Sequence, residues 1–152
     1  MGVIHMKIKK SLLVFVLVLL ASMGNLVLAK QAVTQFSLTE LSLAKHYKVS
    51  LVCEKALSVG NFQQCHLDIF QPGSETKILK NAKISLNGGM PAHHHGLPTS
   101  PVVVWSAKDN NYKIEGLKFS MPGEWELRLL IENNPANPAK IVQDRVLFTF
   151  TI

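Results

Sequence analysis

The feature that most constrains the fold of this chain is the alternation of apolar and polar side chains over short segments. It is clearest at residues 124–131, where Trp125, Leu127, Leu129 and Ile131 alternate with Glu124, Glu126, Arg128 and Leu130. A period of two places successive side chains on opposite faces of a strand. Residues 46–53 and 65–69 follow the same pattern. The sequence therefore predicts a domain built from half-buried strands.

Turn-forming residues separate these segments. The turns are Gly60-Asn61, Pro72-Gly73, Asn87-Gly88-Gly89, Asp109-Asn110-Asn111 and Pro122-Gly123. They leave about seven short strands and no convincing long helix. We also expect a β-bulge at Gly116, where the apolar parity of residues 112–121 changes. This spacing predicts an all-β, immunoglobulin-like sandwich of two antiparallel sheets, with a small barrel as the alternative.

The first 29 residues read as a secretory signal peptide. A basic start at Lys7, Lys9 and Lys10 precedes an apolar run over residues 11–20, and Ala29 ends a small-residue cleavage site. The sequence thus predicts a periplasmic or secreted protein, with an uncleaved membrane anchor as the alternative. Residues 30–45 are expected to form an arm containing one short helical turn or packed segment. The sandwich domain is expected at residues 46–152.

The charge balance argues against a nucleic-acid partner. The whole chain has 16 basic and 10 acidic residues, and three of the lysines lie in the predicted leader. The remainder then carries 13 − 10 = +3. Its basic residues form no stripe interleaved with aromatic side chains, which is the pattern that binds nucleic acids.

The two cysteines, Cys53 and Cys65, share the apolar face of their strands. In an oxidising compartment such a pair usually forms a disulfide. A thiolate metal site is the alternative, but twelve residues of separation match no recognised zinc spacing. We therefore predict a buried Cys53–Cys65 bridge.

The side chains best suited to bind a ligand lie in Met90-Pro-Ala-His-His-His-Gly-Leu-Pro-Thr-Ser-Pro101. In an extended segment His93 and His95 would point to one side and His94 to the other. Met90 is a candidate third ligand, and Met121 is a fourth if its turn lies at the same end of the sandwich. Imidazole and thioether ligands suit copper, whereas zinc more often recruits a carboxylate or thiolate. The alternative is that this histidine loop is only rigid and structural.

The sequence contains no recognisable catalytic arrangement. It lacks a Gly-x-Ser-x-Gly motif, a phosphate-binding glycine loop and a His-Glu-x-x-His motif. We therefore expect a protein that is not an enzyme.

The two motifs together resemble the YtkA-like domain family. The resemblance rests on Met90-Pro-x-His-x-His-Gly-x-Pro-Thr-x-Pro101 and on Tyr112-x-Ile-x-Gly-Leu-x-Phe-Ser-Met-Pro-Gly-x-Trp-Glu-Leu127. It implies a small exported or membrane-tethered sandwich, and it connects some relatives with copper handling or cytochrome oxidase assembly. By position, it marks Met90, His93, His95 and Met121 as the distinctive set. This chain departs from the family pattern at Leu97, where many members have methionine, and at His94, which replaces a small residue.

From these observations we expect copper to be bound for delivery to an envelope or membrane partner. The alternative is a metal-free interaction module of the cell envelope, with the histidine loop in a structural role. A pocket for a small ligand at one end of the sandwich is a third reading. The sequence leaves the oligomeric state undetermined.

Overall fold

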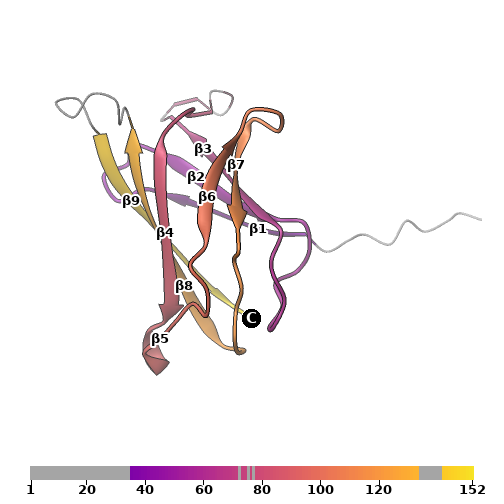
Figure 1. The fold of residues 1–152 in the computed structure, drawn as a ribbon. Coiled ribbons are helices and arrows are strands. Elements are labelled where there is room, and N and C mark those ends of the chain that lie inside the picture. The colour runs from indigo at the N-terminus through magenta and orange to yellow at the C-terminus, as the bar shows by residue number, and fades with distance from the viewer. Residues whose placement is uncertain (1–34, 72, 75, 77, 134–141) are drawn as a thin grey trace, which may run out of the picture. The chain divides into compact units, whose positions relative to one another are not determined.

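Two antiparallel sheets make up the fold (Figure 1). The computed structural model describes residues 35–71, 73–74, 76, 78–133 and 142–152. One sheet has five strands in the order β1-β2-β3-β7-β6. Their bounds are β1 Phe36–Leu41, β2 Lys48–Cys53, β3 Cys65–Phe70, β6 Val102–Ser106 and β7 Asn111–Glu115.

The second sheet has four strands in the order β5-β4-β8-β9. These are β4 Lys83–Met90, β5 His95–Gly96, β8 Glu124–Asn133 and β9 Val142–Thr151. A short 3-10 helix, η1 (Pro91–His93), joins β4 to β5. The long pairing of β8 with β9 runs from Glu124↔Thr151 to Asn133↔Val142. The prediction of an all-β antiparallel sandwich is confirmed.

The core lies between the inward faces of the two sheets. Alternate residues of β8 and β9 are buried, as the period-two pattern predicts. The largest fully buried side chains include Trp125, Tyr112, Phe119 and Phe148. Phe119 contacts the rings of both Trp125 and Phe150 edge to face. This aromatic cluster fixes the segment that precedes β8.

Residues 36–41, expected as one short helical turn or a packed segment, form strand β1, which pairs with β2 along its whole length. Two other local expectations were wrong. Strand β4 continues through Gly88 and Gly89, which we expected to end it. Residues 112–121 are not one bulged strand: β7 ends at Glu115, and Gly116 follows with a φ of +79°. The chain then continues through isolated bridges at Lys118 and Phe119.

The disulfide prediction is confirmed. Cys53 and Cys65 lie directly opposite each other in the β2–β3 pair and are bonded. Both are buried, and no free cysteine remains in the chain. The bridge closes the loop at residues 54–64. Because the two sulfur atoms are bonded to each other, neither is a thiolate that could bind a metal.

Residues Val33–Ile152 form one compact unit, which begins before the expected sandwich boundary at residue 46. The predicted signal peptide at residues 1–29 lies outside the described residues. Within the described ranges, no helix has the length and apolarity needed to cross a membrane.

Several connections meet at one end of the sandwich, drawn lowest in Figure 1, where η1 and β5 lie. The loop at residues 54–64 is tied to the segment after β7 through the Gly60 N–H, which donates to the Phe119 carbonyl at 2.9 Å. The Thr99 hydroxyl donates to the Gly116 carbonyl at 2.7 Å. Gly123 and Ile152 exchange two backbone hydrogen bonds of 2.9 and 3.0 Å. This end carries the histidine loop and the Met121 turn.

Candidate metal centre at one end of the sandwich

The histidine loop is a tight hairpin rather than an extended segment. Met90 pairs with His95, and Gly89 pairs with Gly96, across β4 and β5. Pro91–His93 forms the 3-10 turn between them, and His94 has the left-handed backbone conformation with φ 53° and ψ 28°. The expectation that an extended backbone would alternate the three imidazoles was therefore wrong. The relation of the rings is set by a turn instead.

Glycines in β4 permit this hairpin. A Cβ atom on Gly89 would lie 2.5 Å from the His95 carbonyl oxygen. One on Gly88 would lie 2.6 Å from the Leu127 side chain and 2.7 Å from the Glu126 carbonyl. Both approaches are closer than real Cβ atoms make, so a side chain at either position would push a neighbouring strand away. The Gly-Gly pair allows the neighbouring strands to approach closely, and it does not form a turn.

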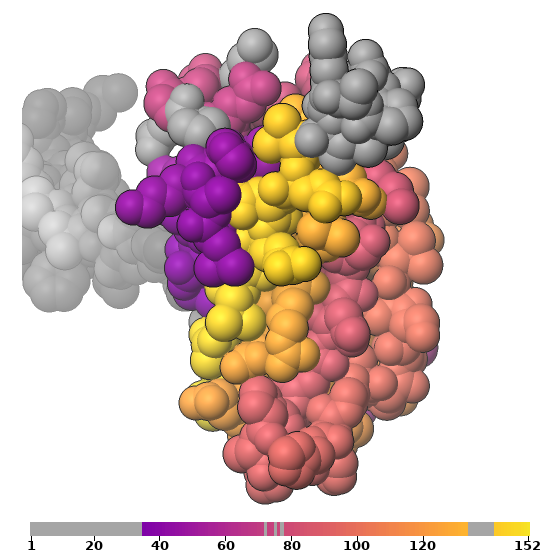
Figure 2. All heavy atoms as spheres, turned by 90° about the vertical axis from the view of Figure 1, so that its left-hand side faces the viewer, coloured from indigo at the N-terminus to yellow at the C-terminus, as the bar shows by residue number. Residues whose placement is uncertain are grey.

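The hairpin brings two of the predicted ligands together. The rings of His93 and His95 have centroids 6.3 Å apart and are tilted by 34°. All three histidines are exposed, and Figure 2 shows their segment at the surface, at the lower end of the view. The side chains of His93 and His95 make no hydrogen bond to other described residues. Their nitrogens thus remain available to a ligand.

Met90 lies next to this pair but faces inward. Its side chain is only 1% exposed. Because directly opposed residues of an antiparallel pair point to the same side of the sheet, Met90 and His95 share a face. The Met90 methyl group lies 2.7 Å from where a Cβ on Gly123 would be. The thioether therefore fills the space between the histidine hairpin and the turn after Met121.

Met121 lies at the edge of the core in that turn. It is half-buried and packs against the core, and its carbonyl accepts a hydrogen bond of 3.0 Å from the Trp125 indole N–H. Gly123, two residues later, has a φ of +126° and contacts Met90. The two loops that carry the four predicted residues therefore meet at this end, with Met90 as the direct contact.

The donor set defines what the site can hold. Among the described residues, no three of His, Cys, Asp and Glu gather in a metal-binding group. A centre here would depend on the two imidazoles, with thioether sulfur as the further donor. This combination fits copper, because thioethers prefer the reduced ion and imidazoles accept either oxidation state.

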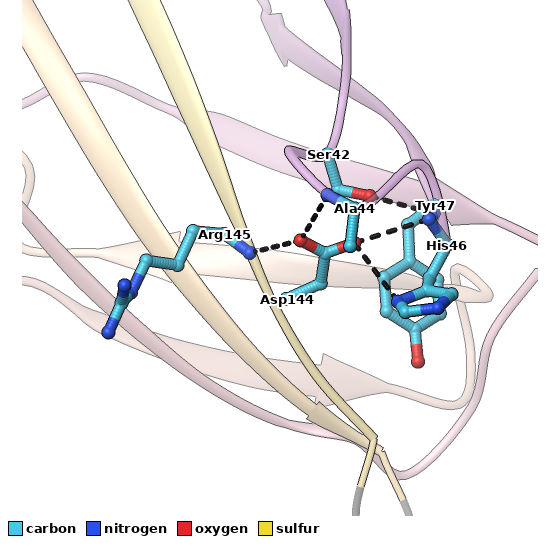
Figure 3. Close-up of polar contacts among 6 residues, drawn as sticks. All are labelled: Ser42, Ala44, His46, Tyr47, Asp144 and Arg145. Carbon is cyan, nitrogen blue, oxygen red and sulfur yellow. Dashed lines mark hydrogen bonds and ion pairs between the residues drawn. The ribbon is translucent and has the colours of Figure 1, made fainter.

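Sequence reasoning missed a polar cluster at Asp144, on the inward-facing side of β9 (Figure 3). Its carboxylate is 2% exposed and accepts backbone hydrogen bonds from Ala44, His46 and Arg145 at 3.0, 3.2 and 2.8 Å. The His46 Nδ1 atom lies 3.3 Å from it. The alternation in β9 is the available signal, since it places Asp144 in phase with Val146 and Phe148.

The electrostatics of this cluster come from competing effects. Burial raises the pKa of Asp144, but hydrogen bonds from Ser42, Ala44, Arg145 and His46 outweigh it and lower the pKa to about 2. The carboxylate is therefore charged at neutral pH and ties the turn between β1 and β2 to β9. The His46 side chain is half-exposed and lies beside this carboxylate.

Comparisons with known proteins agree with this architecture. The profile of the YtkA-like family matches residues 42–129, which is more than half of the chain. A crystal structure of FetP from uropathogenic E. coli strain F11, expressed in the periplasm, is similar in fold, with a TM-score of 0.52 and 10% identity. The match covers 78% of this chain and 96% of that one. No protein with a curated description matches.

The family match spans β2 to β8 up to Leu129 and includes the histidine hairpin and the Met121 turn. The resemblance read from the two sequence motifs is confirmed. The chain belongs to the YtkA-like family.

Proposed function

We propose that this protein is an exported, non-catalytic sandwich that binds copper through His93 and His95, with Met90 and Met121 as sulfur donors. The bound metal would be buffered or delivered to an envelope or membrane protein. The observation that carries the proposal is the β4–β5 register, which sets Met90 opposite His95 on one face.

The distances support a single shared ion. An imidazole-bound metal lies about 2.0–2.1 Å from its ligating nitrogen. The 6.3 Å between the two ring centroids is close to the widest span that one ion can bridge. The pair is exposed, so a metal can enter and leave without opening the fold. Such access suits a carrier that exchanges metal with a partner.

The buried thioether adds a preference between oxidation states. Met90 is a soft donor with a buried side chain, and it pairs with His95 across β4 and β5. Soft sulfur ligands favour Cu(I), whereas the imidazoles alone serve Cu(II). We therefore expect Met90→Leu to weaken Cu(I) binding more than Cu(II) binding.

Export is supported by two independent features. The pattern of residues 1–29 is that of a signal peptide, and the Cys53–Cys65 disulfide is typical of oxidising compartments. The proposal places the protein in the periplasm or outside the cell.

Titration with Cu(I) and Cu(II) tests the metal proposal on protein purified without a histidine tag. The variant His93→Ala/His95→Ala should lose binding. The control His46→Ala/His66→Ala removes the same number of imidazoles elsewhere and should bind like the wild type. Equal affinity in the wild type and the His93→Ala/His95→Ala variant would rule out this site.

A metal-free interaction module is the second candidate. The burial of Met90 favours it, since a methionine that is 1% exposed and packed on Gly123 already has a structural role. The same titration separates the two functions, because a module without metal gives no saturable copper binding in any variant.

A further inference from the structure

Four residues connect Met90 to His95. These two residues pair directly, so residues 91–94 must reverse the chain. Pro91–His93 makes one 3-10 turn, and His94 completes the reversal with its left-handed backbone. The His94 N–H points back to the Pro91 carbonyl oxygen at 3.4 Å. The chain therefore changes direction between His93 and His95 at His94.

We propose that His94 is a positioning residue whose left-handed backbone conformation, and not its imidazole, holds His93 and His95 side by side for the metal. The inference rests on the copper site proposed above. It explains how neighbours in sequence can form a pair whose ring centroids lie 6.3 Å apart without an extended strand between them.

The second support of the pair is the close contact at Gly89. Strand β5 is held so near β4 that the His95 carbonyl lies 2.5 Å from a Cβ position on Gly89. His95 is thus fixed by strand pairing, and η1 fixes His93. With both neighbours held in this way, the left-handed conformation of His94 completes the connection between them.

Residue types differ in their tolerance for this conformation. Glycine adopts it freely, and asparagine and histidine adopt it more readily than most residues. A β-branched residue at positive φ is a steric outlier, because its branched Cβ meets the backbone. The proposal therefore predicts that copper affinity among variants of residue 94 follows how well each residue tolerates the left-handed conformation. It does not follow the ability of the new side chain to bind a metal.

The experiment measures Cu(II) affinity by competition with a chelator, together with the visible and circular dichroism bands of the bound metal. We expect His94→Gly and His94→Asn to bind within about twofold of the wild type, with unchanged bands. His94→Ile should bind about tenfold more weakly with altered bands, since a strained left-handed residue shifts the equilibrium by roughly that factor. His94→Ala gives a milder form of the same test if His94→Ile does not fold.

Asn110 provides the matched control. It has nearly the same φ, 54°, in the hairpin between β6 and β7. Asn110→Ile imposes the same backbone strain away from the histidines, so it should lower stability while leaving copper affinity and bands unchanged.

Three results overturn the inference. Wild-type affinity in His94→Ile means that the conformation does not position the ligands. An equal loss in His94→Gly, His94→Asn and His94→Ile means that the His94 imidazole is itself a ligand. A wild-type protein that binds no copper removes the proposed function and this inference with it, whereas the first two results leave the proposed function intact.

Discussion

Asp144 is a charged residue that shares the buried face of β9 with Val146 and Phe148. It lies on the core side of β9 and remains charged because several donors surround its carboxylate. Two of the backbone donors, Ala44 and His46, come from the turn between β1 and β2, which belongs to the other sheet. In Figure 2 this N-terminal region lies beside β9, and the Leu43 N–H donates to the Arg145 carbonyl there. One carboxylate thus fastens an edge of one sheet to an edge of the other.

Acid should weaken this fastening in a defined pH window. The pKa of Asp144 is about 2 in the folded protein and 3.8 ordinarily. Because the folded pKa is the lower one, its contribution is fully present above about pH 4 and is lost as the pH falls towards 2. We expect Asp144→Asn to lower the free energy of unfolding at pH 7 by about 2 kcal/mol. Urea denaturation at pH 7 and at low pH measures this.

The matched control for that prediction is Asp68→Asn. Asp68 is partly exposed and near His66 at 3.7 Å, so its contribution should be small. A pH dependence of stability below pH 4 that is as steep in Asp144→Asn as in the wild type would contradict the assignment.

Residue identity alone did not show whether a glycine forms a turn or allows two strands to approach closely. Gly88 and Gly89 follow Asn87, and this combination is typical of a turn. Their function in strand β4 depends on Leu127, Glu126 and His95, which approach from other strands. Contacts of this kind come from sheet pairing and have no signal in the local sequence.

At the scale of elements, the turn before β8 is held by packing as well as by backbone conformation. Gly123 has a φ of +126° and meets the Met90 methyl group, whereas Gly60 has a φ of +81° and open space around it. Gly123→Ala should therefore cost about 3 kcal/mol of stability from strain and overpacking together. Gly60→Ala should cost about 1 kcal/mol from strain alone. Thermal and urea unfolding compare the two.

The partner in this contact provides a further check. Combining Gly123→Ala with Met90→Ala removes the methyl group from the clash, so the two costs should be less than additive. Strict additivity would show that Met90 does not press on the turn before β8.

Alternation predicted most strands because a half-buried sheet imposes a period of two. Strands β2, β3, β8 and β9 follow it closely. Strand β1 escaped detection because its apolar residues, Phe36 and Leu38, are only partly buried at a sheet edge. The 3-10 turn at Pro91–His93 escaped because the conformation of three consecutive histidines is set by the β4–β5 pairing.

For the whole molecule, metal binding and folding should be linked. A ligand that binds only the folded state stabilises it by about 2.7 kcal/mol at a hundredfold excess over Kd. Copper should therefore raise the unfolding temperature of the wild type. Differential scanning calorimetry of the wild type, His93→Ala/His95→Ala and His46→Ala/His66→Ala measures this. An equal rise in all three would point to binding elsewhere.

The sequence predicted the sandwich and named the two segments that meet at its end, because both follow from strand count and turn placement. It did not predict how they meet. Met90 was expected as a candidate third ligand, and the structure buries it between the hairpin and the Met121 turn. Burial of that kind depends on the depth at which one sheet stops relative to the other, which strand periodicity does not encode.

The paired hydrogen bonds between Gly123 and Ile152 carry a practical consequence for handling the protein. Any residue joined after Ile152 leaves the fold beside Gly123, in the turn that contacts Met90 at the base of the histidine hairpin. A polyhistidine purification tag attached there would place a competing chelator within reach of the exposed imidazoles. Affinity measurements on such a fusion would report the tag together with the protein, so the copper titrations require protein without a histidine tag.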